Sequence, residues 1–402
     1  MLTIQGSYVC LRALLEAHLR QVRSHGTRCS MKIAFFDIYN PVPINSGGDW
    51  YRFYLLSELG KENDVCEYYA MDVGDKEGHQ PQKTNFKVQY LVPRFSFIKH
   101  SRLLSIIRPD YLLNQSLDSI QTPDAIFFSV FYYHIAKQIA DRNHIPKILI
   151  MHNIEWQYLK ANDSPLYIPM RLYENHVIRN VDAVVTISLS DYEYVNGMID
   201  EEKVFYIPPK IDTELFNPHG QRQELGNDKF NLVFYGSLDR EQNHDALQFI
   251  VQELVPAISN ENMNSRVRVN IFGSGTPPKH FNLEENSGIN FIGQVENPGN
   301  YVRAADAVIV PLKNPGGIKI RILEALACGR PVIASTLSIQ GLPAALQEYV
   351  LTADSVFEYI DAVNMLIEGK TSHVIGANTV LQSLKGESVD DLIEYLKNRA
   401  LS

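Results

Sequence analysis

The chain has 402 residues, of which 45% are hydrophobic and 21% are charged. At about 150 residues per domain this length predicts two or three domains, and the composition is that of an ordinary globular protein rather than a disordered or fibrous chain. Lysine and arginine total 37 against 46 acidic residues, so the net charge of -9 argues against binding to nucleic acid.

The four cysteines, Cys10, Cys29, Cys66 and Cys328, show neither a C-x-x-C spacing nor a pairing with histidine. Neither a disulfide framework nor a zinc site is therefore expected, and a reducing cytoplasm suits this usage. The most apolar run, residues 125–133, is too short to cross a bilayer, so any membrane contact is expected to be peripheral.

The first thirty residues contain four arginines and a single acid, and residues 31–36 then read as an opening strand. An arginine-rich, acid-poor segment is typical of a targeting leader. The alternative is a start codon assigned upstream of the true one at Met31, and we favour this second interpretation.

From Met31 onward, short runs rich in Val, Ile and Phe alternate with turns and amphipathic stretches. They predict strands over 33–36, 125–128, 147–151, 183–187, 231–235, 267–272, 307–311 and 331–335. Continuous apolar strands joined by helices indicate parallel sheets covered on both faces, so the expected fold class is doubly wound α/β. A polar segment without strands, 217–229, predicts the linker between two domains. The ligand is expected in the cleft where the carboxyl ends of two sheets face each other.

The most informative segment is residues 315–334, which read Pro-Gly-Gly-Ile-Lys-Ile-Arg-Ile-Leu-Glu-Ala-Leu-Ala-Cys-Gly-Arg-Pro-Val-Ile-Ala. Gly316 and Gly317 predict a turn before a helix that Gly329 ends. Backbone N–H groups and the helix dipole at such a start can face an anionic group.

Three charged side chains follow this turn. Lys319 and Arg321 add positive charge beside it, and Glu324 suits bidentate hydrogen bonding to a ribose diol. An ordinary helix with an exposed ion pair fits the spacing equally well.

Residues 315–334 resemble the signature of retaining GT-B glycosyltransferases, the glycosyl transferases group 1 family. Other segments resemble the same family in the family's order: 41–48, 151–155, 184–191, 207–218, 231–239, 243–247, 267–275, 289–295 and 305–312. The resemblance therefore extends over most of the chain.

This resemblance implies a GT-B fold of two Rossmann-like domains, with residues 31–220 binding the acceptor and residues 221–385 binding the donor. Residues 386–402 would form a helix that packs back on the first domain. It further implies a hexosyltransferase of polysaccharide biosynthesis that uses a UDP- or GDP-sugar, retains the anomeric configuration and needs no metal. The acceptor would be a glycan or a lipid-linked sugar.

The resemblance also implies roles for individual residues. Lys319 and Arg321 would neutralise the leaving diphosphate, His152 would contact the transferred sugar, and Glu324 would bind the ribose hydroxyls. The remaining donor-binding candidates are Gly47, Gly48, Arg240, Gly273, Gly275, Gly316 and Gly317. His152 is equally compatible with a hydrogen-bonded structural histidine.

Three positions depart from the family pattern. Gly316 stands where many members have a second glutamate, Ser237 and Gln242 where a phosphate-binding Arg and Lys are common, and Ser129 where a histidine is common. These departures motivate an alternative function, a catalytically silent GT-B protein that binds a nucleotide sugar or glycan. A dinucleotide-dependent dehydrogenase is disfavoured, because no G-x-G-x-x-G turn follows the first strand.

Residues 78–109 contain no acid, and basic side chains alternate there with aromatic and leucine side chains. One interpretation is a surface that docks on anionic lipid or holds a lipid-linked acceptor, at the inner face of the membrane. The other is a solvated surface over partly buried aromatic residues.

Overall fold

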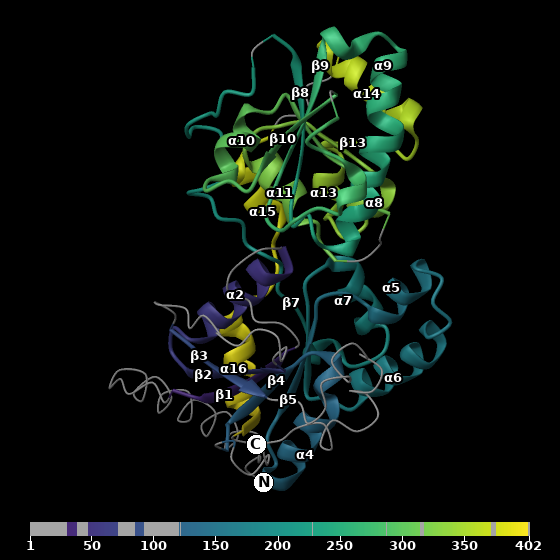
Figure 1. Cartoon of the computed structure of the whole chain (residues 1–402). Helices are drawn as coiled ribbons and strands as arrows, with labels where there is room; N and C mark the ends of the chain where they lie inside the picture. Colours follow the sequence, from purple (N-terminus) through teal and green to yellow (C-terminus); the bar gives the residue numbers. More distant parts are fainter. Residues whose placement is uncertain are drawn as a thin grey trace, which may run out of the picture.

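The computed structural model describes residues 30–37, 47–70, 85–91, 120, 122–226, 228–286, 288–313, 317–370 and 375–400. Two α/β domains lie one above the other, each built on a single sheet (Figure 1). The doubly wound α/β class expected from the sequence is confirmed. Residues 1–29 of the expected leader, and Gly316, lie outside the described residues.

The first domain contains a seven-stranded sheet of order β3-β2-β1-β4-β5-β6-β7, in which every neighbouring pair is parallel. Its strands are β1 (Lys32–Asp37), β2 (Asp64–Ala70), β3 (Lys87–Leu91), β4 (Ala125–Phe128), β5 (Lys147–Met151), β6 (Ala183–Thr186) and β7 (Val204–Tyr206). Its helices are α2 (Gly47–Leu59), α4 (Tyr133–Asn143), α5 (Glu155–Ala161), α6 (Tyr167–Arg179) and α7 (Leu189–Asn196), with short 3₁₀ turns at Val130–Tyr132 and Glu201–Lys203.

Both faces of this sheet are buried, which explains the apolar runs of its central strands. In β4, Ala125 and Phe127 belong to one hydrophobic core, while Ile126 and Phe128 belong to the other. Successive side chains of a strand point to opposite faces, so a strand that is covered on both sides must be apolar throughout.

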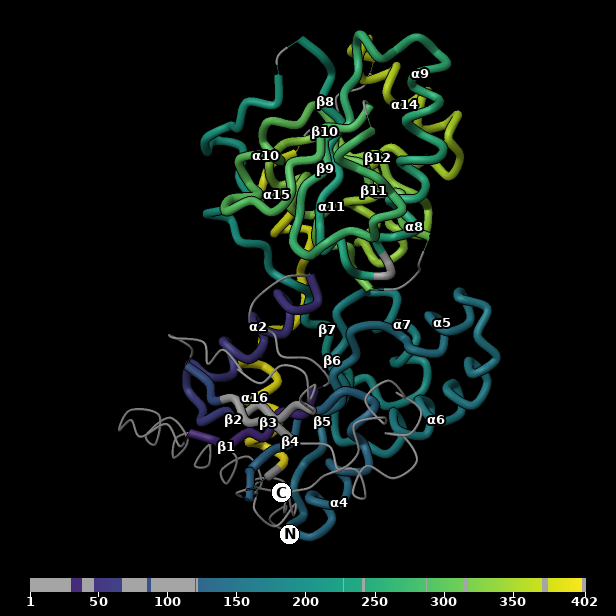
Figure 2. Tube along the Cα trace, viewed as in Figure 1, coloured from purple at the N-terminus to yellow at the C-terminus, as the bar shows by residue number. Residues whose placement is uncertain are grey.

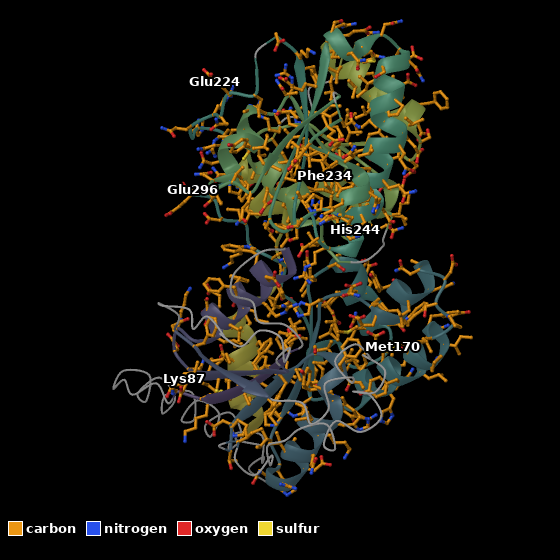
Figure 3. The ribbon with its side chains drawn as sticks, in the orientation of Figure 1. Lys87, Met170, Glu224, Phe234, His244 and Glu296 are labelled. Carbon is orange, nitrogen blue, oxygen red and sulfur yellow. The ribbon has the colours of Figure 1, made fainter. Side chains whose placement is uncertain are left out.

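The second domain contains a six-stranded parallel sheet of order β10-β9-β8-β11-β12-β13. Its strands are β8 (Phe230–Tyr235), β9 (Val267–Phe272), β10 (Ile289–Gly293), β11 (Ala307–Val310), β12 (Val332–Ala334) and β13 (Val350–Thr352). Its helices are α8 (Glu241–Phe249), α9 (Val255–Asn260), α10 (Pro298–Ala304), α11 (Ile320–Ala327), α12 (Thr336–Ile339), α13 (Ala344–Gln347), α14 (Val356–Ile367) and α15 (Ala377–Ser383). A short π-helix, Ile250–Leu254, joins α8 to α9, and 3₁₀ turns occur at Met263–Ser265 and Lys279–Phe281. Figure 3 shows Phe234 of β8 inside this domain and Glu224 and Glu296 at its surface.

Every strand predicted from the sequence is present, but β2, β3, β7, β10 and β13 were not predicted. Four of these five lie at sheet edges, and β2 lies beside one. Of these edge strands, β10 has only partly buried residues and β13 has one buried residue of three, so neither shows the burial on both faces on which the prediction relied. β7 is an exception, because all three of its residues are buried.

The chain passes from β7 to β8 through residues 207–229, which contain no helix or strand in their described part. Figure 2 traces this passage from the lower to the upper domain. Arg303 of α10, which is 2% exposed, holds the passage against the second domain. Its Nη1 donates to the carbonyl of Leu215 at 2.7 Å, and its Nε donates to the carbonyl of Gln221 at 2.8 Å.

The last helix, α16 (Val389–Ala400), returns to the first domain and lies beside α2 (Figure 1). Leu392 and Leu396 are fully buried in the core on the α2 face of the first sheet. The hydroxyl of Tyr395 donates to the carbonyl of Asp182 at 3.1 Å, and Arg399 pairs with the Asp182 carboxylate at 3.0 Å. The chain therefore crosses between the domains twice.

No helix in the described part of the chain is both long and apolar enough to cross a membrane.

Because α16 completes the core of a domain distant in sequence, Leu392→Ala should destabilise the first domain. We expect a loss of about 2–5 kcal/mol in its free energy of unfolding, the usual cost of truncating a buried leucine. Urea denaturation followed by tryptophan fluorescence measures this, since both tryptophans, Trp50 and Trp156, lie in the first domain. Asn398→Ala, at an exposed position of the same helix, is the matched control. Equal stability of the two variants would show that α16 does not support this domain.

Candidate active site

A cavity of about 850 Å³ lies between the domains. On the first-domain side it is lined by residues at or after the ends of β1, β4 and β5, and on the second-domain side by residues after β8, β9, β10 and β11. All of these strands are parallel within their sheets, so their carboxyl ends open toward this one space.

The loop after β8 packs tightly against the loop after β9. A Cβ atom on Gly273, whose φ is +155°, would lie 1.8 Å from the carbonyl oxygen of Gly236. A Cβ atom on Gly236, whose φ is +149°, would lie 2.5 Å from Nη2 of Arg321. Only glycine fits at these two positions. Gly273 allows the two loops to approach each other, and Gly236 leaves space for the guanidinium of Arg321.

Arg321 lies in the first turn of α11 and is anchored at several points. Its Nη2 donates to Oδ1 of Asn243 at 2.9 Å, and its guanidinium carbon lies 5.2 Å from the ring centre of Phe234. Its Nη1 is buried and has no hydrogen-bond partner among the described residues. Burial lowers the pKa of Arg321. The guanidinium has therefore lost its contact with water without gaining a hydrogen-bond partner for every N–H group.

Lys319 precedes α11 and lies between charges of opposite sign from the two domains. Burial and then Arg321 lower its pKa to about 8, while the carboxylate of Asp191 acts to raise it. Asp191 belongs to α7 of the first domain and is 2% exposed. Burial raises the pKa of Asp191 to about 6, against the effects of its hydrogen bond with Ser188 and of Lys319.

Glu324 lies one turn further along α11. The hydroxyl of Tyr235, at the end of β8, donates to Oε2 of Glu324 at 2.7 Å and also lies 3.1 Å from the carbonyl oxygen of Arg321. Burial raises the pKa of Glu324 to about 7, although the Tyr235 hydrogen bond and Arg321 both favour its charged form. Tyr235 fixes one carboxylate oxygen, which leaves Oε1 for another hydroxyl.

On the first-domain side, a chain of charged side chains runs into the cleft. Nε of Arg52 lies 2.7 Å from Oδ2 of Asp37, and Nη1 of Arg52 lies 3.3 Å from Oδ1 of Asp49. Nε2 of His152 lies 3.3 Å from the same oxygen of Asp37. Arg240 of the second domain continues the chain across the cleft, with its Nη2 3.9 Å from Oδ2 of Asp49.

The glycine candidates lie where the domains meet. Gly47 begins α2, and a Cβ atom there would lie 3.2 Å from Cδ1 of Ile320 in the other domain. Gly317, at φ +59°, would place a Cβ atom 3.0 Å from the carbonyl oxygen of His152. Gly48 also lines the cavity. Gly47 and Gly317 therefore allow the backbone of one domain to approach the other domain closely.

The cavity thus brings together most residues nominated from the sequence: Gly47, Gly48, His152, Arg240, Gly273, Gly317, Lys319, Arg321 and Glu324. Gly275 is an exception, because at φ +77° it packs against Asp239 and does not line the cavity. Ser237 and Ser129, which stand where the family often has an arginine and a histidine, line the cavity and are 2% and 6% exposed.

Trp50, Tyr51 and Arg52 lie near the start of α2. All three line the cavity. Tyr51 is 1% exposed and donates to the carbonyl of Ile207, and Trp50 donates through Nε1 to the carbonyl of Lys210. These contacts make them packing residues of α2 as well as part of the cleft wall.

Sequence reasoning did not nominate Asp37, Asp49, Asp191, Tyr235 or Asn243. Asp37 and Tyr235 end the first strands of their sheets, a position that puts a side chain at the cleft. Asp191 and Asn243 act through partners far away in the sequence, and no local pattern marks such pairs. Asp49 contacts Arg240 across the cleft, but its contact with Arg52 is local, three residues apart in α2. Among the described residues, no group of His, Cys, Asp and Glu side chains is arranged to hold a metal ion.

Comparison with known proteins agrees with this geometry. Residues 229–369 match the family described as Glycosyl transferases group 1, and residues 46–215 match the family described as Glycosyltransferase Family 4. No curated protein sequence matches the chain.

Several solved structures share the fold. Sucrose-phosphate synthase from Thermosynechococcus elongatus superposes with a TM-score of 0.67 at 16% identity, over 92% of this chain and 99% of that chain. HepE from Anabaena, in complex with UDP-glucose, gives 0.63 at 13% identity, over 92% and 100%. A glycosyltransferase from Rickettsia africae gives 0.57 at 13% identity, over 92% and 97%. With a family match in each half and this fold, the chain is a glycosyltransferase of GT-B architecture.

Proposed function

We propose that this enzyme transfers a hexose from a nucleoside diphosphate sugar to a glycan or lipid-linked acceptor, with retention of the anomeric configuration and without a metal ion. The second domain binds the donor and the first domain binds the acceptor. The observation that carries the proposal is the convergence of Lys319, Arg321 and Glu324, which come from one short segment, on the cavity between the domains.

In this proposal Glu324 binds the ribose of the donor. Tyr235 holds Oε2 of the carboxylate, and the remaining oxygen accepts from a ribose hydroxyl. Such a bond stabilises the charged form of a carboxyl group whose pKa burial has raised to about 7. Donor binding and ionisation of Glu324 therefore favour each other.

Lys319 and Arg321 act on the diphosphate. During transfer the bond from the anomeric carbon to the diphosphate breaks, the acceptor oxygen bonds to that carbon, and the hydroxyl proton leaves with the diphosphate or to solvent. Negative charge grows on the diphosphate as its bond breaks, so cations already in place stabilise the transition state more than the bound donor. The guanidinium of Arg321 suits this role because Asn243 already holds it at the wall of the cavity.

His152 is proposed to contact the transferred sugar. The Asp37 carboxylate beside Nε2 favours the tautomer with its proton on Nε2, and this contact holds the imidazole ring in its orientation. Asp37 is thus a positioning residue for His152.

The acceptor is proposed to approach beside α5, whose Glu155 and Tyr158 line the cavity. Immediately after α5, Leu166, Ile168 and Leu172 are 40%, 56% and 70% exposed. Exposed apolar side chains next to an acceptor site support a lipid-linked acceptor and a peripheral contact with a membrane. The preference for an anionic membrane at the cytoplasmic face rests on the sequence of the basic segment 78–109, most of which lies outside the described residues.

Vesicle co-sedimentation tests the membrane contact. We expect stronger sedimentation with anionic than with neutral vesicles, and weaker sedimentation of Leu172→Ser with both. Equal sedimentation with both vesicle types would remove the membrane part of the proposal and leave the transfer reaction untouched.

Release of nucleoside diphosphate from a panel of UDP-, GDP- and ADP-sugars, with mixed glycan and lipid acceptors, tests the reaction. UDP-glucose is the first donor to try, because HepE is known in complex with it. Proton NMR of the product reports whether the anomeric configuration is retained.

Glu324→Ala should weaken donor binding by about 1.5–3 kcal/mol, the range for a charge-assisted hydrogen bond, and Tyr235→Phe should weaken it by less. Unchanged donor affinity in Glu324→Ala would remove the ribose assignment.

The pH dependence of kcat/KM tests the role of Lys319. Its charged form binds the diphosphate, and its pKa is lowered to about 8, so kcat/KM should fall as the pH rises through about 8. Asp191→Asn removes a charge that raises this pKa, so the decline should begin at a lower pH. Lys319→Arg should abolish the decline up to about pH 10, because arginine stays protonated. A decline with the same midpoint in Lys319→Arg would assign the titration to another group.

A further inference from the structure

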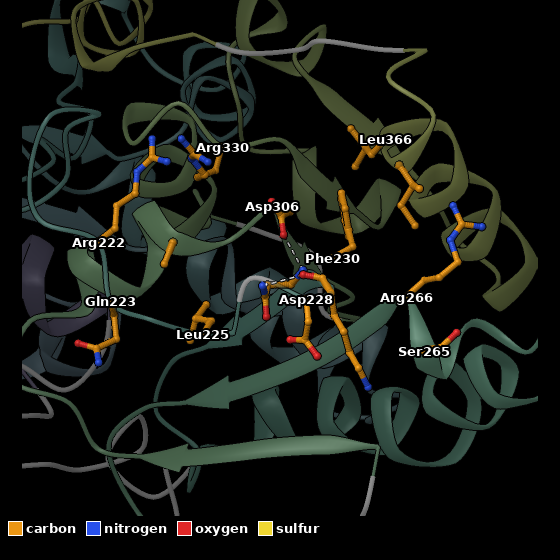
Figure 4. Close-up of a pocket in the computed structure, with 14 residues that line it drawn as sticks. Arg222, Gln223, Leu225, Asp228, Phe230, Ser265, Arg266, Asp306, Arg330 and Leu366 are labelled. Carbon is orange, nitrogen blue, oxygen red and sulfur yellow. Dashed lines mark hydrogen bonds between the residues drawn. The ribbon is translucent and has the colours of Figure 1, made fainter.

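A second cavity, of about 560 Å³, lies at the opposite end of the second sheet from the active-site cleft. Figure 4 shows the side chains that line it. It is lined by residues at the amino ends of the strands, among them Phe230 of β8, Asp306 before β11 and Arg330 before β12. The cavity shares no lining residue with the cleft.

The charges around this cavity are unevenly compensated. Four basic side chains, Arg222, Lys229, Arg266 and Arg330, face two acidic ones, Asp228 and Asp306. Asp228 lies 3.7 Å from Arg268, which does not line the cavity, and Lys229 donates to the carbonyl of Asn264 at 2.7 Å. In a chain of net charge -9, a cavity with this excess of positive charge requires a physical explanation.

Arg330 is held in place by neutral groups. Its Nη1 donates to the carbonyl of Ala305 at 3.1 Å, and its Nε donates to the carbonyl of Cys328 at 3.4 Å. Its pKa is lowered, first by burial and second by Arg222, and the opposing effect of Asp306 is the smaller. Oδ2 of Asp306 is already the acceptor for the backbone N–H of Asn231 at 2.7 Å.

Arg222 is exposed, and its guanidinium lies at the same end of the cavity as that of Arg330 (Figure 4). Two guanidinium groups that repel each other are stabilised by an anion placed between them, and each offers a planar fork of N–H donors that suits phosphate oxygens. The pair therefore has the chemistry of a site for a doubly charged oxyanion.

The rest of the wall is apolar. Phe230, Leu366 and Ile367 are partly exposed, and Leu225, which belongs to the passage between the domains, is buried. An inorganic ion would leave these side chains in contact with water, whereas an organic group attached to a phosphate would cover them.

We propose that this cavity is a second ligand site, which binds a small organic phosphomonoester with its phosphate between Arg222 and Arg330 and its carbon skeleton against Phe230, Leu366 and Ile367. Arg222, Gln223 and Leu225 belong to the passage between the two domains, and the N–H of Gln223 donates to the carbonyl of Asn300 in α10. A ligand at this site would therefore touch the segment that connects the donor-binding domain to the first domain.

Calorimetric titration with phenyl phosphate and with inorganic phosphate tests the site in the full-length protein, with UDP present to occupy the cleft. We expect both probes to bind, with phenyl phosphate at least about threefold tighter because its ring covers apolar surface. Arg222→Gln should weaken both by about tenfold or more, since it removes one charged partner of the phosphate. Arg222 is exposed, so this variant should keep the melting temperature and the transfer activity of the unmodified enzyme.

Arg179→Gln, which makes the same charge change at an exposed position of α6, is the matched control and should bind both probes normally. Absence of binding heat, or equal affinities in Arg222→Gln and the control, would overturn the proposal. Equal affinity for the two probes would overturn the apolar part of the site. The comparison between the two variants can be repeated without UDP, so it does not depend on the proposed transfer reaction.

Discussion

Parallel pairing of all strands within each sheet is the constraint that places the chemistry of this protein. Every loop at a carboxyl end opens on the same side of its sheet, and these sides of the two sheets face each other. Groups as distant in sequence as Asp37 and Glu324 therefore line one cavity without any local relation between them. The same pairing leaves the amino ends of the second sheet on the far side, where the Arg222–Arg330 cavity lies.

Several charged side chains of the cleft are buried, and the loss of water shifts their pKa values. On the second-domain side, Lys319 and Arg321 have lost water, and burial is the largest cause of the lowered pKa of each. First-domain carboxylates act on this side across the cleft: Asp191 on Lys319, and Asp49 on Arg240. These pairs favour contact between the domains when no anion lies between them. A diphosphate has the same sign of charge as the carboxylates, so it would compete with them for the same cations.

Much of the fold could be predicted from the sequence, because central strands covered on both faces must be apolar throughout. The edge strands β10 and β13 escaped prediction for the same reason, since they are covered less completely. In the site, Lys319, Arg321 and Glu324 could be nominated because they share one short segment with a recognisable pattern. The contacts of Arg52 with Asp37 and of Asp49 with Arg240, and the pairing of Asp191 with Lys319, depend on tertiary packing that no spacing in the sequence encodes.

A crystal structure with UDP bound would locate the donor site directly. We expect the diphosphate between the glycine backbone at Gly47 and Gly48 and the side chains of Lys319 and Arg321, with the ribose hydroxyls on Glu324. We also expect Arg240 to have moved away from Asp49 toward the phosphates. A nucleotide bound outside this cavity, or bound within it with Glu324 still contacting only Tyr235, would contradict the account.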